Sequence, residues 1–390
     1  MTSHLTLVQP NKNSNGTAVE YELTSDQSAL DLYSLLEHLG VVAVGYGVDR
    51  TSRTVKLAGA SAAEVLLRLD QRPPTVRKAV AASKLDEADV GGRLLAELRW
   101  HHEMQRIGVT CLVPLMRTTL GDDPTFYDAV FVGRYTLGER LVQGRETSTS
   151  LVAKVERCLS ELANQLYWRR NERSQFSYVQ IVDKRYASLR KLSPFADSVW
   201  EDGVVVNGRP YPALKSLFAW LESTADLADI VTPEGGRECH GDLILDNILV
   251  TDGVARDAPL TLDPNPANCS PLTDVGKLAM NALVYYDLAL RDLIDCDHGV
   301  PVGERTYLNW QVIDRHPGVM SSLDALADWL FQERMPMTTN WGPRLLKAQA
   351  ALHSLAIAPF HVLHHHAIGR GHYFVARGVQ LLHECLVNES

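Results

Sequence analysis

The chain has 390 residues, 45% of them hydrophobic and 22% charged, and its mean hydropathy of -0.11 is that of an ordinary globular protein. These values exclude a disordered or collagen-like chain and leave room for two or three domains around a sizeable core. Lys and Arg number 38 against 47 Asp and Glu, and the formal charge of -9 disfavours broad binding to the phosphate backbone of nucleic acid.

Neither the cysteines nor the apolar runs indicate secretion or membrane insertion. The six cysteines are scattered without a C-x-x-C pair, so reduced thiols are expected rather than a zinc finger or a disulfide scaffold. Residues 1–21 are polar and lack the basic and apolar segments of a secretory signal. No apolar run approaches the roughly 20 residues that span a bilayer. We therefore expect a soluble, cytoplasmic protein that binds no membrane.

The first third of the chain predicts an antiparallel sheet with helices before and inside it. Apolar residues at helical spacing predict a helix over 25–39, which Gly40 ends. The β-prone runs that follow are 41–48, 54–58, 64–69 and 75–81, each bounded by turn residues. A second helix is predicted over 92–106, and two more strands over 109–115 and 129–132. Together these runs predict a sheet of about five strands.

Beyond residue 135 the pattern is mostly helical. Helical stripes lie in 151–166, 214–221, 278–293, 323–330, 345–355 and 374–382. A β-hairpin over 248–262, with Asp252-Gly253 as its turn, is expected to be part of this helical lobe. A sheet followed by helices predicts an α+β fold. We divide the chain into an N-terminal extension (1–40), a small lobe (41–135) and a helical lobe (136–390).

One stretch of the helical part combines several residues of catalytic type. His240-Gly-Asp242 is followed by Asn247, and Asp263 ends the second strand of the predicted hairpin. Phosphoryl transfer needs a carboxylate that orients the attacking hydroxyl and accepts its proton, for which Asp242 is suited. It also needs oxygen ligands that hold magnesium on the nucleotide phosphates, for which Asn247 and Asp263 are suited. A His-Gly-Asp tripeptide by itself is compatible with an ordinary loop.

These residues resemble the hallmark of the aminoglycoside phosphotransferase and choline kinase-like superfamily, H-G-D-x-x-x-x-N followed by a strand that ends in I/L-D. His240 to Asn247 matches every fixed position, and Leu262-Asp263 supplies the second element. The segment 272–278, Leu-Thr-Asp-Val-Gly-Lys-Leu, looks like a branch with a D-x-x-K-L helix start. The resemblance covers about 55–280 and implies a bilobal protein-kinase-like fold with a small antiparallel-sheet lobe and a mainly helical lobe.

In such a fold, a strand lysine contacts the nucleotide phosphates and pairs with a glutamate on the following helix. The matching positions here are Lys78 and Glu97, and Arg77 and Lys84 are rivals for the lysine. Lys78 is favoured because it shares one face of the strand with Val76 and Val80. A solvated surface lysine is the alternative.

The resemblance also implies where the nucleotide is held. A loop with Gly59 and Ser61 occupies the position that covers the phosphates, although the sequence Gly45-Tyr-Gly47 competes with it. The run 131–135 resembles the hinge that binds the purine edge, with Tyr135 as a candidate contact or, alternatively, a core residue. Mg²⁺ and either ATP or GTP are the implied cofactors.

The expected activity is transfer of the γ-phosphoryl group to a hydroxyl of a small molecule. Aminoglycosides or aminocyclitols, sugars and nucleosides remain open as acceptors, as does a homodimer. The rival hypothesis is a kinase-like binding or scaffold module without catalysis. A protein kinase is disfavoured because the chain lacks an A-P-E segment and has a long helical span between residues 136 and 239.

Two further clusters have simpler explanations. His361 and His365 have the i, i+4 spacing of metal ligands, with His364, His366 and His372 nearby. No acidic residue lies between them, so packing or substrate contact is favoured. The acidic residues Asp287, Asp292, Asp295 and Asp297 are compatible with binding an amino group, but a solvated face is the simpler interpretation.

Overall fold

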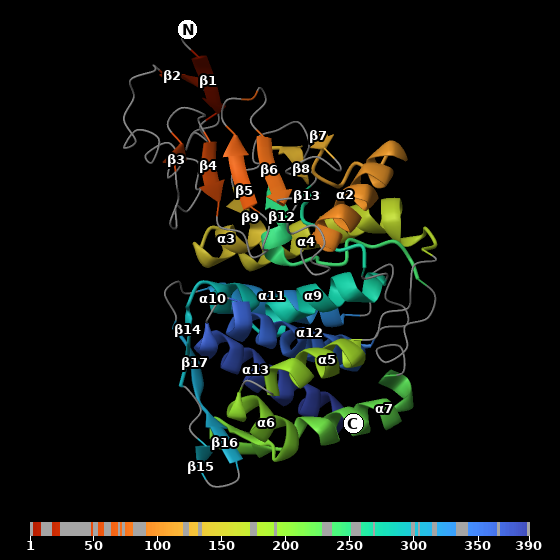
Figure 1. The fold of residues 1–390 in the computed structure, drawn as a ribbon, viewed down its shortest axis with the longest axis vertical. Helices are drawn as coiled ribbons and strands as arrows, with labels where there is room; N and C mark the ends of the chain where they lie inside the picture. Colours follow the sequence, from red (N-terminus) through yellow and green to blue (C-terminus); the bar gives the residue numbers. More distant parts are fainter. Residues whose placement is uncertain are drawn as a thin grey trace. The chain divides into compact units, whose positions relative to one another are not determined.

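A computed structural model of the 390-residue chain describes residues 3–8, 18–23, 48–49, 54–57, 64–68, 71, 75–80, 91–119, 125–131, 135–171, 178–190, 193–227, 236–250, 259–267, 270–297, 301–302, 305–313, 318–332, 342–364 and 367–387. The chain divides into two compact units. The first is Met1–Thr136 with Leu249–Leu262, and the second is Leu137–Ile248 with Asp263–Ser390. The first unit is built on antiparallel strands and the second is mainly helical (Figure 1). The predicted α+β class, with a small sheet part and a larger helical part, is confirmed.

The first unit contains a six-stranded sheet in the order β3-β4-β5-β6-β8-β7. Its strands are β3 (Val48–Asp49), β4 (Thr54–Leu57), β5 (Glu64–Arg68), β6 (Thr75–Val80), β7 (Leu115–Thr119) and β8 (Thr125–Val130), and all neighbours are antiparallel. A separate antiparallel pair joins β1 (Ser3–Val8) and β2 (Ala18–Leu23). The helix predicted over 25–39 and most of the strand predicted over 41–48 lie outside the described residues.

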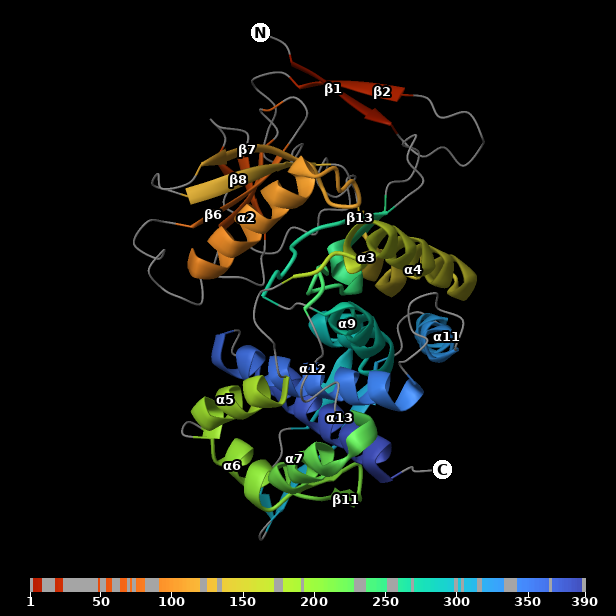
Figure 2. The same ribbon diagram turned by 90° about the vertical axis from the view of Figure 1, so that its right-hand side faces the viewer.

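Helix α2 (Gly91–Arg106) follows β6 in the chain and lies across one face of the sheet (Figure 2). Leu94 and Leu98, one turn apart on α2, pack with Val80 of β6 and Tyr127 of β8 in a buried cluster. Apolar side chains four residues apart share one face of a helix, so this stripe seats α2 on the sheet. The helix predicted over 92–106 is confirmed.

The strand predicted over 109–115 is wrong. Residues 109–114 are largely buried but contain no strand, and β7 begins at Leu115. The backbone of this run bonds to another strand: Val113 N donates to Thr261 O at 3.0 Å, and Thr261 N donates to Cys111 O at 2.8 Å. Pro114 has no N–H to offer a sheet partner. The next strand, predicted over 129–132, occupies 125–130.

The hairpin after Asn247 belongs to the first unit, contrary to our expectation that it would be part of the helical lobe. β12 (Ile248–Val250) lies between β13 (Leu260–Thr261) and β9 (Tyr135–Thr136) in a three-stranded sheet. Backbone pairing with β9, and the bonds from Thr261 to the 111–113 run, tie 249–262 to that unit. The predicted Asp252-Gly253 turn lies outside the described residues.

The second unit is organised around the long helix α12 (Pro343–His364). It packs against α13 (Ile368–Val387), α9 (Pro271–Leu283) and α5 (Tyr178–Arg190) (Figure 2). The other helices among the described residues of this unit are α3 (Leu137–Val142), α4 (Ser148–Leu162), the π-helical η2 (Ala163–Tyr167), α6 (Pro194–Glu201), α7 (Leu214–Ser223), η3 (Ala225–Leu227), η4 (Leu245–Asn247), α10 (Tyr286–Leu290) and α11 (Val319–Phe331).

Two small sheets complete the described part of this unit. β11 (Arg209–Tyr211), β10 (Val204–Val206), β16 (Arg305–Leu308) and β15 (Pro301–Val302) form one, and β14 (Ile294–Cys296) pairs with β17 (Trp310–Val312) in the other. The apolar stripes predicted for the helices are buried: on α4 they comprise Leu151, Val155, Cys158, Leu159 and Leu162. Burial of these stripes is what holds such helices together.

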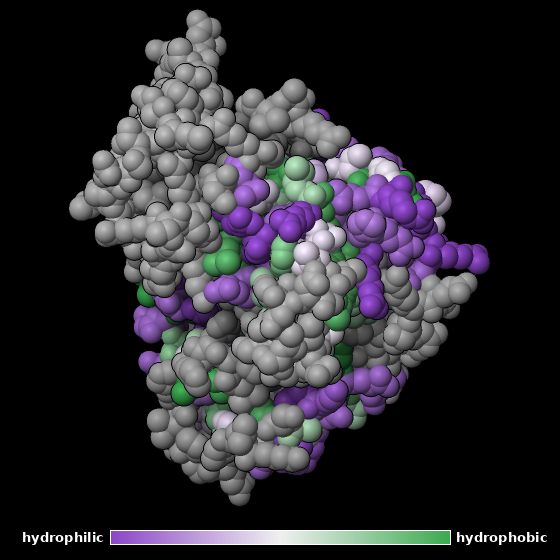
Figure 3. Space-filling model, turned by 45° about the horizontal axis from the view of Figure 1, so that its top comes forward, coloured by the Kyte–Doolittle hydropathy of each residue, from purple (hydrophilic) through white to green (hydrophobic). Residues whose placement is uncertain are grey.

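The surface is mixed in character. On the face shown in Figure 3, the described residues are mostly hydrophilic, and hydrophobic ones appear in small separate areas. Scattered apolar residues of this kind are normal on globular proteins. Among the described helices, none combines the length and the apolar composition that crossing a bilayer requires.

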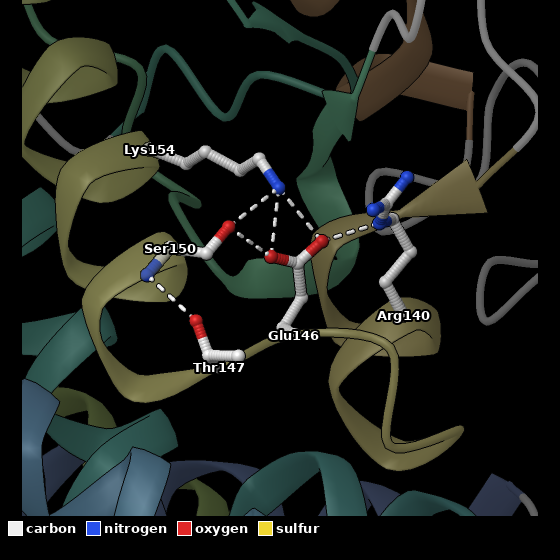
Figure 4. A network of polar contacts seen from close by, with 5 residues as sticks. All are labelled: Arg140, Glu146, Thr147, Ser150 and Lys154. Atoms are coloured by element: carbon white, nitrogen blue, oxygen red, sulfur yellow. Dashed lines mark hydrogen bonds and ion pairs between the residues drawn. The ribbon is translucent and has the colours of Figure 1, made fainter. Parts of the chain in front are cut away.

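The buried Glu146 carboxylate stabilises the connection between α3 and α4 (Figure 4). Glu146 accepts from Lys154 Nζ at 2.8 and 2.7 Å, from Ser150 Oγ at 2.7 Å and from the Arg140 guanidinium. Thr147 caps α4 by accepting the N–H of Ser150. Burial raises the pKa of Glu146, but the hydrogen bonds from Lys154 and Ser150 and the charges of Lys154 and Arg140 outweigh it, so the pKa lies below its ordinary value.

Candidate active site

The segment with His240, Asp242 and Asn247 is a closed loop directly before β12. Gly241 has a φ of +78°, a conformation that glycine adopts without the steric penalty of a Cβ. Asn247 Nδ2 donates to the backbone oxygen of Asp242 at 2.7 Å, and Asp242 N donates to His240 Nδ1 at 3.3 Å. These bonds bring Asp242 and Asn247, two of the predicted site residues, together across the loop.

The loop is anchored by a buried carboxylate on α9. Asp274 is fully buried and accepts the backbone N–H groups of His240 at 2.8 Å and Gly241 at 2.6 Å. The Tyr167 hydroxyl donates to it at 3.0 Å. Burial raises the pKa of Asp274 to about 7; the three hydrogen bonds oppose this shift and the negative charge of Asp242 adds to it. Asp274 therefore supplies acceptors that fix the two peptide groups on either side of the His240 Cα.

Asp263, the third predicted residue, begins the segment after β13. Its φ of +54° is uncommon for a residue other than glycine, and such strained positions concentrate at functional sites. Asn265 N, two residues on, donates to His240 O at 2.8 Å. This bond ties the Asp263 segment to the Asp242 loop, so both belong to one arrangement in the second unit.

The donor set fits magnesium better than a transition metal. Asn247 Nδ2 donates to Asp242 O, so the amide oxygen of Asn247 points away from that contact. Asp263 adds a carboxylate as a second oxygen ligand for a metal. Within the described ranges there is no group of three or more His, Cys, Asp and Glu residues that could hold a metal ion. Magnesium is commonly held by one or two protein oxygens together with phosphates and water, which is what this pair could provide.

Asp246, beside Asn247, forms an ion pair with Arg291. Arg291 Nη2 lies 2.7 Å from Asp246 Oδ1, and its Nη1 lies 3.8 Å from Asp287 Oδ1. Asn281 donates to Asp287 Oδ2 at 2.6 Å and accepts the N–H of Leu245 at 3.1 Å. Burial and the negative charge of Asp246 raise the pKa of Asp287. The Asp246 charge is thus compensated by Arg291, which directly follows α10, and the network holds η4 in place.

The four acidic residues after Leu283 therefore differ in their exposure to solvent. Asp287 is fully buried inside this network, which differs from the solvated face that we favoured. Asp292, Asp295 and Asp297 are exposed, as that interpretation predicts. Asp287 lies in the first turn of α10, where Asn281 of α9 donates to it, whereas the other three residues follow the end of that helix at Leu290.

In the first unit, Lys78 and Glu97 form the predicted ion pair. Lys78 Nζ lies 2.9 and 3.1 Å from the two carboxylate oxygens of Glu97, and the residues are 7% and 2% exposed. Tyr127, opposite Lys78 in the sheet, donates its hydroxyl to Glu97 Oε1 at 2.6 Å. A buried ion pair of this kind needs such additional hydrogen bonds to offset its desolvation.

The rival lysine positions are not equivalent to Lys78. Arg77 lies on the opposite face of β6, where it donates to Asp128 at 2.7 and 2.8 Å and stacks on the Phe126 ring. Lys84 lies outside the described residues, as do Gly59, Ser61 and Gly45-Tyr-Gly47. Tyr135 opens β9, pairs with Val250 and is half-buried; its contact with a purine stays a prediction.

No sequence signal indicated a lysine that contacts Asp242. Lys277 Nζ, on α9, lies 2.9 Å from Asp242 Oδ1. Asp274 and Lys277 fall in the D-x-x-K-L segment, which marked a helix start without assigning them a contact. Arg291 was missed as well. Asp274, Lys277 and Arg291 each lie more than 30 positions from the residues they contact in the loop, so only the fold brings them there.

The described histidines of the C-terminal cluster pack against aromatic rings. The His372 ring lies 3.8 Å from that of Phe195, and the His361 ring 5.0 Å from that of Phe374, measured between centroids. His365 and His366 lie outside the described residues.

Comparison with known proteins adds little. No protein-family model matches the chain, and no curated protein matches its sequence. One solved structure, described as the crystal structure of aminoglycoside-3'-phosphotransferase of type VIII, aligns with 82% of this chain and 97% of its own at 16% identity and a TM-score of 0.35. At these values the similarity assigns neither an activity nor a substrate to the chain.

Proposed function

We propose that this protein is a magnesium- and nucleotide-dependent phosphotransferase that moves the γ-phosphoryl group of ATP or GTP to a hydroxyl of a small molecule. The acceptor classes compatible with the sequence are aminoglycosides or aminocyclitols, sugars and nucleosides. The proposal rests on the residues of the second unit, and the Lys78–Glu97 pair of the first unit adds to it.

The observation that carries the proposal is the way the chain joins Asp242, Asn247 and the Asp263 segment. Asn247 is bonded to Asp242, and Asn265 bonds the Asp263 segment to His240. A carboxylate next to an amide and a second carboxylate is the set that phosphoryl transfer uses for the acceptor and for the metal.

In this mechanism the Asp242 carboxylate accepts a hydrogen bond from the acceptor hydroxyl and orients its oxygen. The oxygen attacks the γ-phosphorus, and the bond between that phosphorus and the β,γ-bridging oxygen breaks. The nucleoside diphosphate leaves with the electron pair, and the hydroxyl proton passes to Asp242. Because the transition state is loose, orientation of the hydroxyl matters more than its prior deprotonation.

The remaining groups hold the donor. Asn247 and Asp263 would hold magnesium, which when bound neutralises negative charge on the phosphates. Lys78, held by its ion pair with Glu97, is suited to contact the α and β phosphates. An ammonium on a stem fixed by a buried carboxylate is preorganised for that contact, so little side-chain entropy is lost when the nucleotide binds.

The test is phosphoryl transfer by the full chain from ATP and from GTP, with magnesium, to a panel of aminoglycosides, aminocyclitols, sugars and nucleosides. Release of nucleoside diphosphate gives the rate, and mass spectrometry identifies the phosphorylated product. Asp242→Asn keeps the shape of the side chain and removes its charge. We expect its turnover to fall at least about 10²-fold, with little change in nucleotide affinity.

A matched control is Asp328→Asn, which changes an exposed aspartate on α11 in the same unit and should leave turnover unchanged. Near-normal turnover in Asp242→Asn would refute the catalytic role of Asp242. Nucleotide binding without transfer to any acceptor or to water would favour the binding-module hypothesis.

A further inference from the structure

Lys277 is placed where it can act on the catalytic carboxylate. It lies on α9, three residues after Asp274, and its Nζ is 2.9 Å from Asp242 Oδ1. The two side chains are 15% and 20% exposed, so the pair is largely withdrawn from solvent. Partial burial makes the interaction stronger than that of an ordinary surface ion pair.

Attachment of the loop to α9 does not explain this contact. The loop backbone is already held by Asp274, which takes the N–H groups of His240 and Gly241. Lys277 contacts the side chain of Asp242, so the property it can control is the orientation and the charge environment of that carboxylate.

The backbone around Lys277 is fixed by close packing. A Cβ added to the preceding residue, Gly276, would overlap the side chain of Gln349 on α12. Gln349 in turn contacts His353 at 3.2 Å between their Nε2 atoms, and both residues are buried. α9 and α12 therefore approach closely at this point, which restricts how far the base of the Lys277 side chain can move.

We propose that Lys277 is a positioning residue for phosphoryl transfer, which holds Asp242 in the orientation that receives the acceptor hydroxyl and offsets its negative charge. This inference rests on the proposed function. An ionised carboxylate has about four lone-pair sites, so it can accept from Lys277 and from a hydroxyl at once. A triphosphate is repelled by a bare carboxylate, and an ammonium 2.9 Å from that carboxylate reduces the repulsion.

The experiment compares Lys277→Met, which keeps the length of the side chain and removes its charge, with Lys277→Arg, which keeps the charge. Rates are measured with magnesium and ATP or GTP, using the best acceptor of the panel or, where none is turned over, hydrolysis with water as acceptor. We expect kcat of Lys277→Met to fall about 10- to 10²-fold with little change in the KM for nucleotide. Lys277→Arg should lose less than about 10-fold.

A double-mutant cycle separates positioning from a merely structural role. If Lys277 acts through Asp242, adding Lys277→Met to Asp242→Asn should lower kcat no further. Lys347→Met is the matched control, because it removes a lysine from another ion pair of the same unit, at 3.6 Å from Glu384, and should leave kcat unchanged.

Two results would overturn the inference while leaving the proposed function intact. One is a normal kcat in Lys277→Met. The other is an equal loss from Lys277→Met in the wild-type and Asp242→Asn backgrounds, which would indicate a structural effect. A wild-type chain that transfers phosphate neither to an acceptor nor to water would refute the proposed function itself.

Discussion

The Asp274 carboxylate accepts the backbone N–H of Gly241 at 2.6 Å, and this contact joins helix α9 to the loop that carries Asp242. The same carboxylate accepts the N–H of His240. The position of the catalytic candidate therefore depends on a residue that touches neither nucleotide nor acceptor in the proposed mechanism.

Asp274→Asn replaces one carboxylate oxygen by an amide that cannot accept a hydrogen bond. One buried donor loses its partner, so the free energy of unfolding should fall by about 1–3 kcal/mol, and turnover should fall with it. Urea unfolding and steady-state rates measure the two effects. Asp328→Asn, an exposed change on α11, should alter neither; wild-type stability in Asp274→Asn would contradict the anchoring role.

Glu97→Ala should destabilise the first unit. It removes the carboxylate that pairs with a lysine 7% exposed, and removing one partner of a buried ion pair costs about 3–5 kcal/mol. Hydrogen exchange of the α2 amides is the local measurement. Lys78→Met combined with Glu97→Ala should recover part of the loss, because no ammonium then remains.

The control for the Lys78–Glu97 pair is an exposed ion pair of the second unit, Arg190–Asp197. Asp197→Ala breaks the contact with Arg190, in which the aspartate side chain is 55% exposed, and should cost less than about 1 kcal/mol. Equal losses in Asp197→Ala and Glu97→Ala would show that burial of the Lys78–Glu97 pair is not decisive.

Asp263→Asn should abolish most turnover without unfolding the protein. Asparagine tolerates the left-handed conformation that Asp263 adopts, so the backbone is preserved while the charge of the proposed metal ligand is lost. We expect a fall of at least about 10²-fold in kcat and a higher magnesium requirement, read from rates across a magnesium titration.

Asp292→Asn is the matched control for Asp263, because Asp292 has the same φ of +54° and is 84% exposed. It should keep normal turnover. A normal magnesium dependence in Asp263→Asn would exclude Asp263 as a metal ligand.

Stability should depend on pH through Glu146. Its pKa in the folded protein lies below the ordinary value of 4.5, so the folded state binds the proton less readily than the unfolded state does. The stabilisation is therefore present above that ordinary value and is lost as the pH falls through the lower, folded-state pKa.

Glu146→Gln should remove the pH-dependent stabilisation by this carboxylate. The free energy of unfolding of the variant should therefore decline less steeply than that of the wild type as the pH falls below about 5. Urea titrations at several pH values measure the slope. Glu222→Gln, at an exposed position on α7, should keep the wild-type slope. Identical slopes in Glu146→Gln and the wild type would refute the contribution of this carboxylate.

Several elements could be predicted from the sequence because their signals are local. The helix over 92–106 follows from the 3.6-residue spacing of its apolar side chains, and the strands around Lys78 follow from their alternation and turn residues. Alternation also placed Lys78 and Arg77 on opposite faces of β6, as the contacts with Glu97 and Asp128 confirm.

The errors came where a local pattern has two interpretations. The run 109–113 is largely apolar and buried, as a strand would be, but the backbone groups of Cys111 and Val113 bond to Thr261. The hairpin at β12 was assigned to the helical part because helices flank it in sequence, whereas its backbone pairs with β9. Burial can be read from composition, but the identity of a hydrogen-bonding partner cannot.

The sequence by itself therefore determined the α+β class, the alternation that puts Lys78 and Arg77 on opposite faces of β6, and the loop that holds Asp242 and Asn247, since each depends on residues close together in the chain. Only the tertiary structure decided that Asp274 fixes this loop, that Lys277 pairs with Asp242 and that Arg291 forms an ion pair with Asp246. These contacts join residues more than 30 positions apart. They exist because α9 and α10 pack beside the loop, and no spacing rule along one chain encodes that packing.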